Sequence, residues 1–154
     1  MRVPLSLNVN GVAYPLEVEP GTTLLLAVRD HVGLTGAKEG CDDSECGACM
    51  MLLDGRPVNA CSYLALQAEG RAVTTVEGLA DGGLSPLQEA FLEHGGVQCG
   101  FCTPGMLISA TALLAKHPNP TEQEVRIGLS GNLCRCTGYD GIVKAVLSVA
   151  AARN

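Results

Sequence analysis

The sequence predicts an α+β protein in two parts, with strands in the first half of its 154 residues and helices in the second. Three observations lead to this prediction. Apolar residues alternate with other residues in short runs up to residue 76, helix-start patterns take over after residue 85, and Asp81-Gly82-Gly83 has the composition of a connector. We therefore expect one domain over residues 1–78 and an all-helical domain over residues 79–154.

Alternation and turn residues define the elements of the first half. The dipeptides Asn10-Gly11 and Asp54-Gly55 suit tight hairpin turns, because both of their positions tolerate positive φ angles. Thr22 or Thr23 can cap a helix that runs from about Leu24 to His31. The expected strands are residues 3–9, residues 12–18, residues 50–53, a return strand through Val58, and residues 72–76.

The second half carries helix caps followed by apolar faces. Ser85-Pro86-Leu87-Gln88 combines a capping residue, proline at the first helical position and a glutamine that can complete a capping box. The expected helices run from Pro86 to His94, from Thr103 to just before Pro118, from the capping box at Thr121, and from about Gly141 to Ala152. Four short helices suggest a compact four-helix bundle.

Composition narrows the classes of partner. The net charge is −6 and no basic run occurs, which argues against nucleic acid and anionic membranes as partners. No stretch approaches the roughly 18 apolar residues of a membrane span, and the first residues lack the apolar core of an export signal, so we expect a cytoplasmic protein. Mean hydropathy is +0.23, which either partner subunits covering apolar surface or alanine-rich helices would explain.

Eight cysteines in such a chain require an explanation. A disulfide framework needs an oxidising compartment, whereas no export signal is visible and the cysteines occur in tight groups. Thiolate metal sites are therefore the favoured interpretation. The first group is Cys41, Cys46, Cys49 and Cys61, and the second is Cys99, Cys102, Cys134 and Cys136.

The spacing of the first group is C-x4-C-x2-C with a fourth cysteine after eleven further residues. This is the plant-type ligand pattern for a [2Fe–2S] cluster, and it fits a zinc knuckle poorly. The second group reads C-x2-C, a gap of 31 residues, then C-x-C. Zinc ribbons also pair thiolates across a long gap, so spacing alone leaves this group open between iron–sulfur and zinc.

The residues around the thiols suit an anionic cluster, whose formal charge is about −2 with two ferric ions, two sulfides and four thiolates. Glycines such as Gly40 and Gly47 let backbone N–H groups approach sulfur, and Cys102 directly precedes a helix start with its positive dipole end. Four acidic residues surround the first group and would either disfavour reduction or form a solvated loop face: Glu39, Asp42, Asp43 and Glu45.

Two longer segments carry a family resemblance. Residues 98–106 read QCGFCTPGM and residues 131–139 read GNLCRCTGY. They resemble the two signatures of the iron–sulfur subunit of molybdenum hydroxylases, the xanthine oxidase family, in the three-subunit form found for aerobic carbon monoxide dehydrogenase. The first cysteine loop and residues 33–36 match as well, so the resemblance covers nearly the whole chain and identifies the second group as iron–sulfur. One departure is Ser44, where many members carry glycine.

The resemblance implies a β-grasp, plant-type ferredoxin-like domain followed by a helical [2Fe–2S] domain, and an electron-transfer role. A large subunit would bind molybdopterin, a medium subunit would carry FAD, and the complex would be a dimer of heterotrimers. The cluster of the helical domain would lie nearer the pterin. By that match, Gln98 is a candidate hydrogen-bond partner of the pterin and Cys136 the ligand closest to it. No acid–base catalytic residue is expected in this chain.

Two other functions remain alternatives. The chain could be a free-standing double-cluster carrier that docks transiently, although Gln98 with the Cys134-Arg135-Cys136 loop favours a permanent pterin contact. It could also be a zinc-stabilised interaction module. The substrate would be chosen by the large subunit, so carbon monoxide, a purine, an aldehyde, an N-heterocycle and an aromatic acyl-CoA all remain open.

Overall fold

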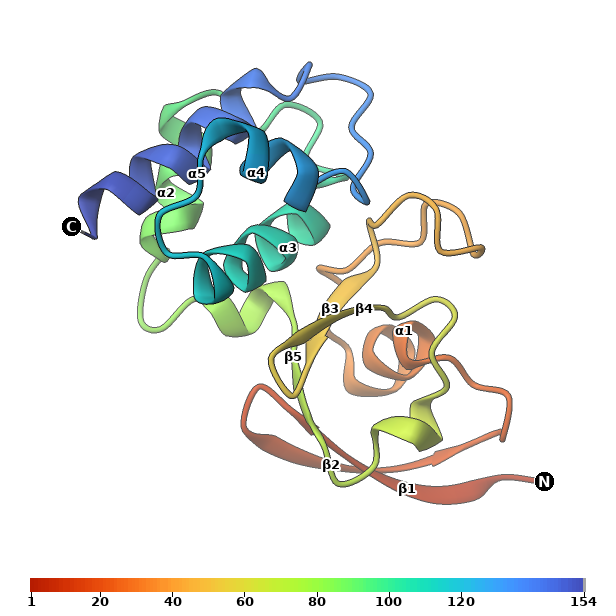
Figure 1. Ribbon diagram of the computed structural model, residues 1–154. Helices are drawn as coiled ribbons and strands as arrows, with labels where there is room; N and C mark the ends of the chain where they lie inside the picture. The colour runs from red at the N-terminus through yellow and green to blue at the C-terminus, as the bar shows by residue number, and fades with distance from the viewer. Residues whose placement is uncertain (154) are drawn as a thin grey trace.

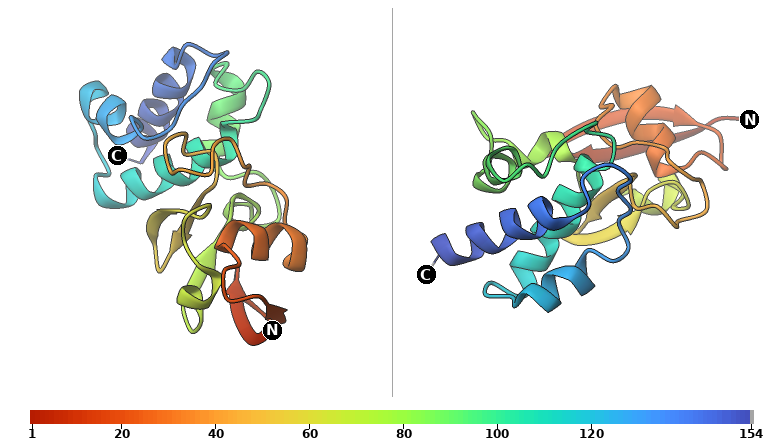
Figure 2. Two further views of the ribbon diagram at one scale, coloured as in Figure 1. Left: turned by 90° about the vertical axis from the view of Figure 1, so that its right-hand side faces the viewer. Right: turned by 90° about the horizontal axis from the view of Figure 1, so that it is seen from above.

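The computed structural model describes residues 1–153 and has the expected α+β architecture (Figure 1). A five-stranded sheet with its short helices occupies one end of the molecule, and four helices occupy the other. The N-terminus lies at the far end of the sheet and the C-terminus at the far end of the helices, as the turned views also show (Figure 2).

The sheet has the strand order β2-β1-β5-β3-β4. Strands β1 and β5 are parallel and the other neighbours are antiparallel. Both predicted hairpins are confirmed: Asn10 and Gly11 have φ angles of 52° and 81°, and Asp54 and Gly55 have 50° and 78°. The strands are β1 (Val3–Val9), β2 (Val12–Val18), β3 (Met50–Leu53), β4 (Arg56–Asn59) and β5 (Ala72–Thr74).

The helix of the first half begins as predicted but winds differently. Thr23 caps α1 (Leu24–Leu26) by accepting a hydrogen bond from the Leu26 N–H. The chain then continues as a π-helix, η1 (Ala27–Val32), which Gly33 ends with a φ of 86°. Leu5, Leu7 and Val9 of β1 and the first residues of this helix are buried in the core of the first half.

Two short 3-10 helices were not predicted, namely η2 (Ala65–Ala68) and η3 (Val76–Leu79). The expected strand of residues 72–76 is shorter than predicted, because Thr75 leaves the sheet to bond Asn10 and η3 begins at Val76. The Asn10 carboxamide accepts from the Thr75 N–H and donates to its hydroxyl, both at 2.9 Å. Val76 and Leu79 pack against the core of the second half, so η3 joins the two halves.

The helices of the second half match the prediction closely. Ser85 and Thr121 both form capping boxes, and α2 and α4 pack against α5 around a core that includes Phe91 and Ile142. No helix of residues 1–153 is long and apolar enough to cross a membrane. The helices are α2 (Pro86–Glu93), α3 (Thr103–Lys116), α4 (Glu122–Gly128) and α5 (Asp140–Ala152).

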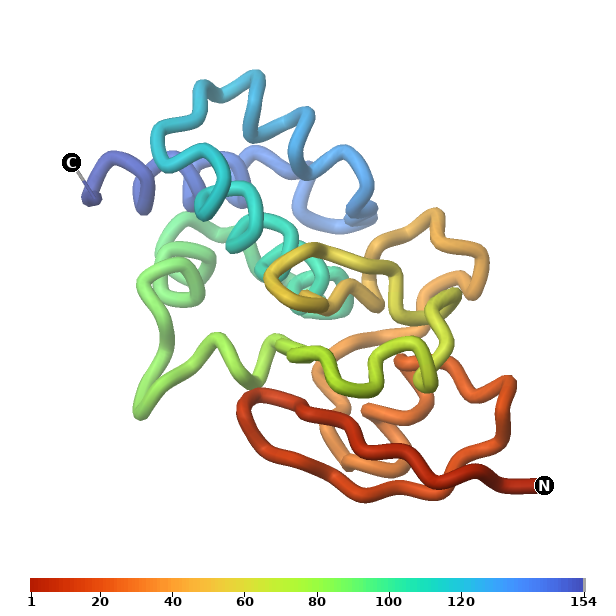
Figure 3. The backbone as a smooth tube through the Cα atoms, turned by 60° about the horizontal axis from the view of Figure 1, so that its bottom comes forward, coloured from red at the N-terminus to blue at the C-terminus, as the bar shows by residue number. Residues whose placement is uncertain are grey.

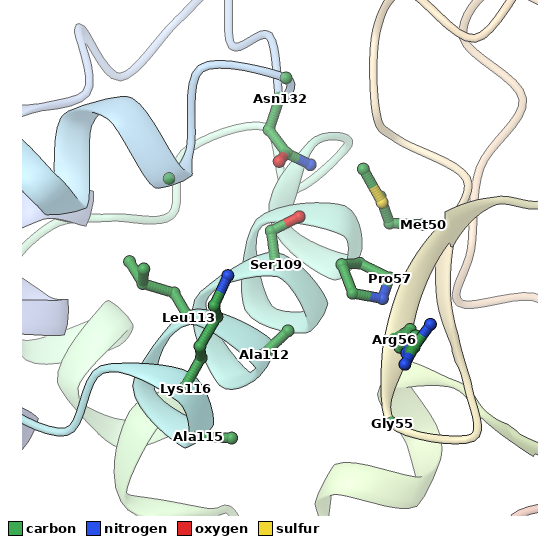
Figure 4. A pocket seen from close by; sticks show the side chains of 12 residues that line it. Met50, Gly55, Arg56, Pro57, Ser109, Ala112, Leu113, Ala115, Lys116 and Asn132 are labelled. Carbon is green, nitrogen blue, oxygen red and sulfur yellow. The ribbon is translucent and has the colours of Figure 1, made fainter.

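Helix α3 connects the two halves, because it contacts the β3–β4 hairpin as well as the other helices (Figure 3). A groove of about 750 Å³ lies on the surface where α3 and this hairpin meet, with Ser109, Pro57 and Asn132 among its lining residues (Figure 4). The Ser109 hydroxyl is buried there without a hydrogen-bond partner among the described residues. The first cysteine loop and the loop before α5 lie beside the other end of α3 (Figure 1).

Candidate metal centres

The first cysteine group is built from one long loop and the end of a hairpin. Cys41, Cys46 and Cys49 lie on the loop between η1 and β3, and β4 returns the chain to Cys61. Cys49 and Cys61 are buried and within hydrogen-bond reach of each other. The three-plus-one arrangement expected from the spacing is therefore present.

Backbone N–H groups in this loop point at sulfur. The Cys46 N–H lies 3.4 Å from the Cys41 sulfur, and the Ala48 N–H lies 3.5 Å from the Cys46 sulfur. Gly40 makes room for this geometry, because a Cβ atom there would lie 2.9 Å from the Cys46 sulfur. N–H donors of this kind are what an anionic cluster requires when it is partly buried.

Ser44, where the chain departs from the family pattern, adopts a backbone conformation that favours glycine. Its φ angle is 68°, in the left-handed region that glycine occupies without steric cost. The serine is retained in this conformation with a hydrogen bond between its hydroxyl and that of Ser62. The loop therefore keeps a glycine-like turn at this position. The neighbouring acidic residues Glu39, Asp42, Asp43 and Glu45 are all exposed, as expected for a solvated loop face.

The second cysteine group is assembled from two loops, one before α3 and one before α5. The Cys99 and Cys136 sulfurs are 3.5 Å apart, and those of Cys134 and Cys136 are 3.9 Å apart. Two thiolates bound tetrahedrally to one metal ion at about 2.3 Å lie roughly 3.8 Å from each other. Each distance is therefore close to that of two sulfurs on one metal ion and too long for a disulfide bond, but Cys136 can share an iron with only one of its two neighbours, since each iron of a [2Fe–2S] cluster takes two cysteines.

Thr137 and Tyr139 orient the second group, a role that the sequence did not suggest. The Thr137 hydroxyl lies 2.9 Å from the Cys134 sulfur, and the Thr137 N–H lies 3.4 Å from it. The Tyr139 hydroxyl accepts a hydrogen bond of 2.9 Å from the Cys134 N–H. Tyr139 itself precedes α5 with a φ of 69°, so the chain turns sharply at this point.

The pKa values of the thiols differ with burial and with hydrogen bonding. Burial raises the pKa of Cys49 and of Cys102 to about 12. Burial also opposes ionisation of Cys134, but hydrogen bonds from the Thr137 hydroxyl and backbone outweigh it and lower the pKa of Cys134 to about 7. Metal ions bind thiolates and displace these protons, so the buried thiols would ionise only on loading.

The residues present fit iron–sulfur clusters. All eight cysteines are free thiols, in two separate groups of four. Cys102 is the N-cap of α3 without a side-chain cap bond, and no acidic residue stands in the first turn, so the positive end of the helix faces this group. Within residues 1–153, no three side chains of His, Cys, Asp or Glu are arranged closely enough around one point to hold a single metal ion.

The second group lies partly open at the surface. Cys99 and Cys136 are exposed, and so are the pterin candidate Gln98 and Arg135. Phe101 and Leu133 keep 46% and 55% of their surface exposed beside them, which is unusual for large apolar side chains. Several of these residues line a pocket over the thiols, so this face combines an apolar rim with reachable sulfur.

Comparison with known proteins identifies the family of each half of the chain. Residues 7–80 match the family of the 2Fe-2S iron-sulfur cluster binding domain, and residues 75–147 match that of the [2Fe-2S] binding domain. The nicotinate dehydrogenase small FeS subunit of Eubacterium barkeri is 51% identical over 146 residues, which span 94% of this chain and 93% of the relative.

Solved structures give the same result for the fold. The crystal structure of quinoline 2-oxidoreductase from Pseudomonas putida 86 matches with a TM-score of 0.95 and 48% identity, over 99% of this chain and 94% of that chain. The aldehyde oxidoreductase of Desulfovibrio desulfuricans ATCC 27774 matches with a TM-score of 0.93 and 44% identity, over 97% of this chain but 17% of that longer chain. The chain therefore belongs to the small iron–sulfur subunits of molybdenum hydroxylases, the xanthine oxidase family.

Proposed function

We propose that this chain relays electrons from a molybdopterin centre on a large partner subunit, through two [2Fe–2S] clusters in sequence, to FAD or another acceptor. Electrons would enter at the cluster of Cys99, Cys102, Cys134 and Cys136, and leave through the cluster of Cys41, Cys46, Cys49 and Cys61. The observation that carries the proposal is the direct contact of the two ligand loops, where the Leu133 N–H donates to the Cys46 carbonyl at 2.9 Å.

The order of the two clusters rests on exposure. The second group has two exposed thiols, Cys99 and Cys136, whereas the thiols of the first group are all half-buried or buried. An exposed sulfur edge with an apolar rim is suited to a cofactor held by another subunit. We assign Gln98 as a hydrogen-bond partner of the pterin and Cys136 as the ligand nearest to it, and both side chains are exposed on this face.

Each cluster would have its own domain, with a β-grasp domain over residues 1–78 and a four-helix bundle over residues 79–154. Two separate hydrophobic cores support the division, one from Leu5 to Val73 and one from Leu87 to Ala150. Because Val76 and Leu79 pack on the second core, the structural boundary would fall a few residues earlier, between β5 and η3.

The assembly would contain a large molybdopterin-binding subunit and a medium FAD-binding subunit, arranged as a dimer of heterotrimers. The small-subunit relatives and the longer aldehyde oxidoreductase chain support the presence of such partners. Eight reduced thiols would persist most easily in the cytoplasm, which supports the expected location. The substrate would be selected by the large subunit.

The test is anaerobic purification of the chain alone and together with its large partner. About four iron atoms and four sulfides per chain, and two distinct electron paramagnetic resonance (EPR) signals after dithionite, are expected for two [2Fe–2S] clusters. A stable heteromer in which substrate reduces both clusters supports the relay. A monomer that reduces several acceptors supports the free carrier instead, and zinc in place of iron supports an interaction module. Colourless, EPR-silent material would overturn the proposal.

A further inference from the structure

A buried asparagine joins the two cysteine loops across the middle of the molecule. The Asn132 side chain keeps only 3% of its surface exposed, and its amide nitrogen donates to the Gly47 carbonyl at 3.2 Å. The next residue, Leu133, donates its backbone N–H to the Cys46 carbonyl at 2.9 Å. Two adjacent residues of the second loop thus hold two adjacent residues of the first.

These hydrogen bonds adjoin ligands on both sides. Cys46 is itself a proposed ligand of the first cluster, and Leu133 directly precedes Cys134 of the second. The path from the Cys46 side chain to the Cys134 side chain therefore runs along the backbone of Cys46, across one hydrogen bond of 2.9 Å, and along the backbone of Leu133 and Cys134. Any movement of segment 46–47 away from segment 132–133 lengthens that route and the distance between the clusters.

The backbones at this junction approach too closely for side chains. A Cβ atom on Gly105, in the first turn of α3, would lie 2.1 Å from the Gly47 carbonyl oxygen and 3.2 Å from the Ala48 Cα. A Cβ atom on Gly47 would lie 2.4 Å from the Gly131 carbonyl oxygen, and Gly47 also has a φ of 74°. Glycine is therefore required at both positions, because a methyl group at either one would clash with a backbone carbonyl oxygen.

Asn132 is a costly choice if stability alone is at stake. Burying a carboxamide costs free energy unless it is hydrogen-bonded, and an apolar side chain would pack there without that penalty. Among residues 1–153, the buried polar side chains are Thr75, Ser109 and Asn132. Among these three, Ser109 has no partner within residues 1–153 and Thr75 bonds Asn10 at the turn of the first hairpin, so in the described part of the chain Asn132 is the buried polar side chain that bonds one cysteine loop to the other.

We propose that Asn132 is a positioning residue that sets the separation and the electronic contact of the two clusters by fixing the first cysteine loop against the second. The inference rests on the proposed function, since it needs two clusters in one chain. It makes a separate claim, because both clusters could be present while their spacing depended on other contacts. Gly47 and Gly105 contribute to the same positioning, because they allow the backbones of the first cysteine loop, the second cysteine loop and α3 to approach closely.

The first experiment compares Asn132→Asp and Asn132→Ala with Asn8→Ala, a control on the exposed surface of β1. All are purified anaerobically as the holo subunit and fully reduced. The readout is the splitting of the EPR signals, which arises from magnetic coupling between the reduced clusters and falls with the cube of their separation. We expect the two Asn132 variants to lose or broaden this splitting while iron and sulfide content stay at the level of the unmodified chain.

Two results of this experiment would overturn the positioning role of Asn132. Unchanged splitting in both Asn132 variants overturns it, and so does the loss of one cluster without a change of splitting in the fraction that retains both. A failure of the unmodified chain to show two clusters would instead contradict the proposed function. The two failures are therefore distinguishable on the same samples.

The second experiment uses a matched pair of glycines. Gly105→Ala places a methyl group against the Gly47 carbonyl, whereas Gly131 has open space and no positive φ, so Gly131→Ala is a control from the same junction. Alanine is the better helix former, so helix propensity alone would stabilise Gly105→Ala. We expect this variant to melt roughly 3–8 °C lower and to change the splitting, with Gly131→Ala unchanged in both. A Gly105→Ala protein that melts at or above the original temperature with unchanged splitting would overturn the close junction.

Discussion

The Cys46 carbonyl oxygen and the Leu133 N–H are 2.9 Å apart, so the two ligand loops, which come from opposite halves of the chain, share a backbone hydrogen bond. The first loop is otherwise supported by the sheet and the second by α3 and α5. This bond and its neighbour from Asn132 make the proposed clusters parts of one structural unit. A substitution in either half can therefore be tested for its effect on the nearer cluster and, separately, for its effect on the other cluster.

We expect each cluster to be removable without the other. Cys61→Ser takes a ligand from the first group and Cys134→Ser takes one from the second, and the two groups have separate hydrophobic cores. Each variant should lose about half of the iron and one of the two reduced EPR signals, because each proposed cluster holds two irons. The two variants serve as controls for each other. Loss of the same signal from both would contradict the assignment of ligands to two groups.

Asn10 should contribute more stability than a turn residue normally does. Its carboxamide makes two hydrogen bonds of 2.9 Å to Thr75, which is buried, so Asn10→Ala leaves the Thr75 N–H unsatisfied, while the Thr75 hydroxyl keeps its bond to Glu77. We expect a loss of about 2–3 kcal/mol of unfolding free energy, measured by urea denaturation. Asn8→Ala, on the exposed face of the adjacent strand β1, is the surface control. Equal effects of the two substitutions would show that the bonds to Thr75 add nothing.

The ion pair of Asp54 and Arg71 should make stability depend on acid pH. The Arg71 guanidinium lies 2.7 Å from the Asp54 carboxylate and holds the pKa of that carboxyl below its usual value. A carboxyl group with a lowered folded-state pKa adds stability that is present above its unfolded pKa of about 3.9 and is lost as the pH falls through the folded pKa.

The test compares the original protein with Asp54→Asn, which keeps a residue that tolerates the positive φ at this turn. The melting temperature of the variant should be lower at about pH 7 and should converge with that of the original as the pH falls through the lowered pKa of the Asp54 carboxyl. The difference should be small, because both side chains are partly exposed. A constant difference at all pH values would attribute the effect to the turn and not to the charge.

The cap of α2 offers a prediction on the helical half. The Ser85 hydroxyl accepts from the Gln88 N–H at 3.3 Å, and the Gln88 side chain accepts from the Ser85 N–H at 2.8 Å. Ser85→Ala should cost about 1 kcal/mol of unfolding free energy, whereas Ser85→Asp, which can still cap, should cost less. Chemical denaturation of the three proteins measures this. A loss from Ser85→Asp as large as that from Ser85→Ala would show that the cap bond is not the cause.

Local patterns predicted most of the elements. The turns at Asn10-Gly11 and Asp54-Gly55 and the cap at Ser85 depend on residues within a few positions, and all three appear as expected. The family resemblance supplied what spacing left open, because it predicts iron–sulfur and not zinc for the second half, and residues 75–147 match the [2Fe-2S] binding domain family. That Cys99, Cys102, Cys134 and Cys136 are the ligands stays a prediction.

Features that depend on distant partners were not predictable. The strand of residues 72–76 ends early because Thr75 bonds Asn10 across 65 residues of sequence. Asn132 stands in a loop segment whose asparagine suggests only a turn, and its partner Gly47 is 85 residues away. The π-helical winding of η1 also has no local signal, because Ala27–Val32 has the composition of an ordinary helix.

The contact between the two cysteine loops is made largely of main-chain atoms from Cys46, Gly47, Gly105 and Leu133, with one carboxamide inserted. Main-chain groups are the same in every protein, so the contact between the two cysteine loops depends little on the identity of the surrounding side chains. Hybrid subunits that take residues up to β5 from one relative and the remainder from another should accordingly assemble, provided the glycines and the asparagine are kept. Such hybrids would allow the potentials of the two redox centres to be exchanged independently.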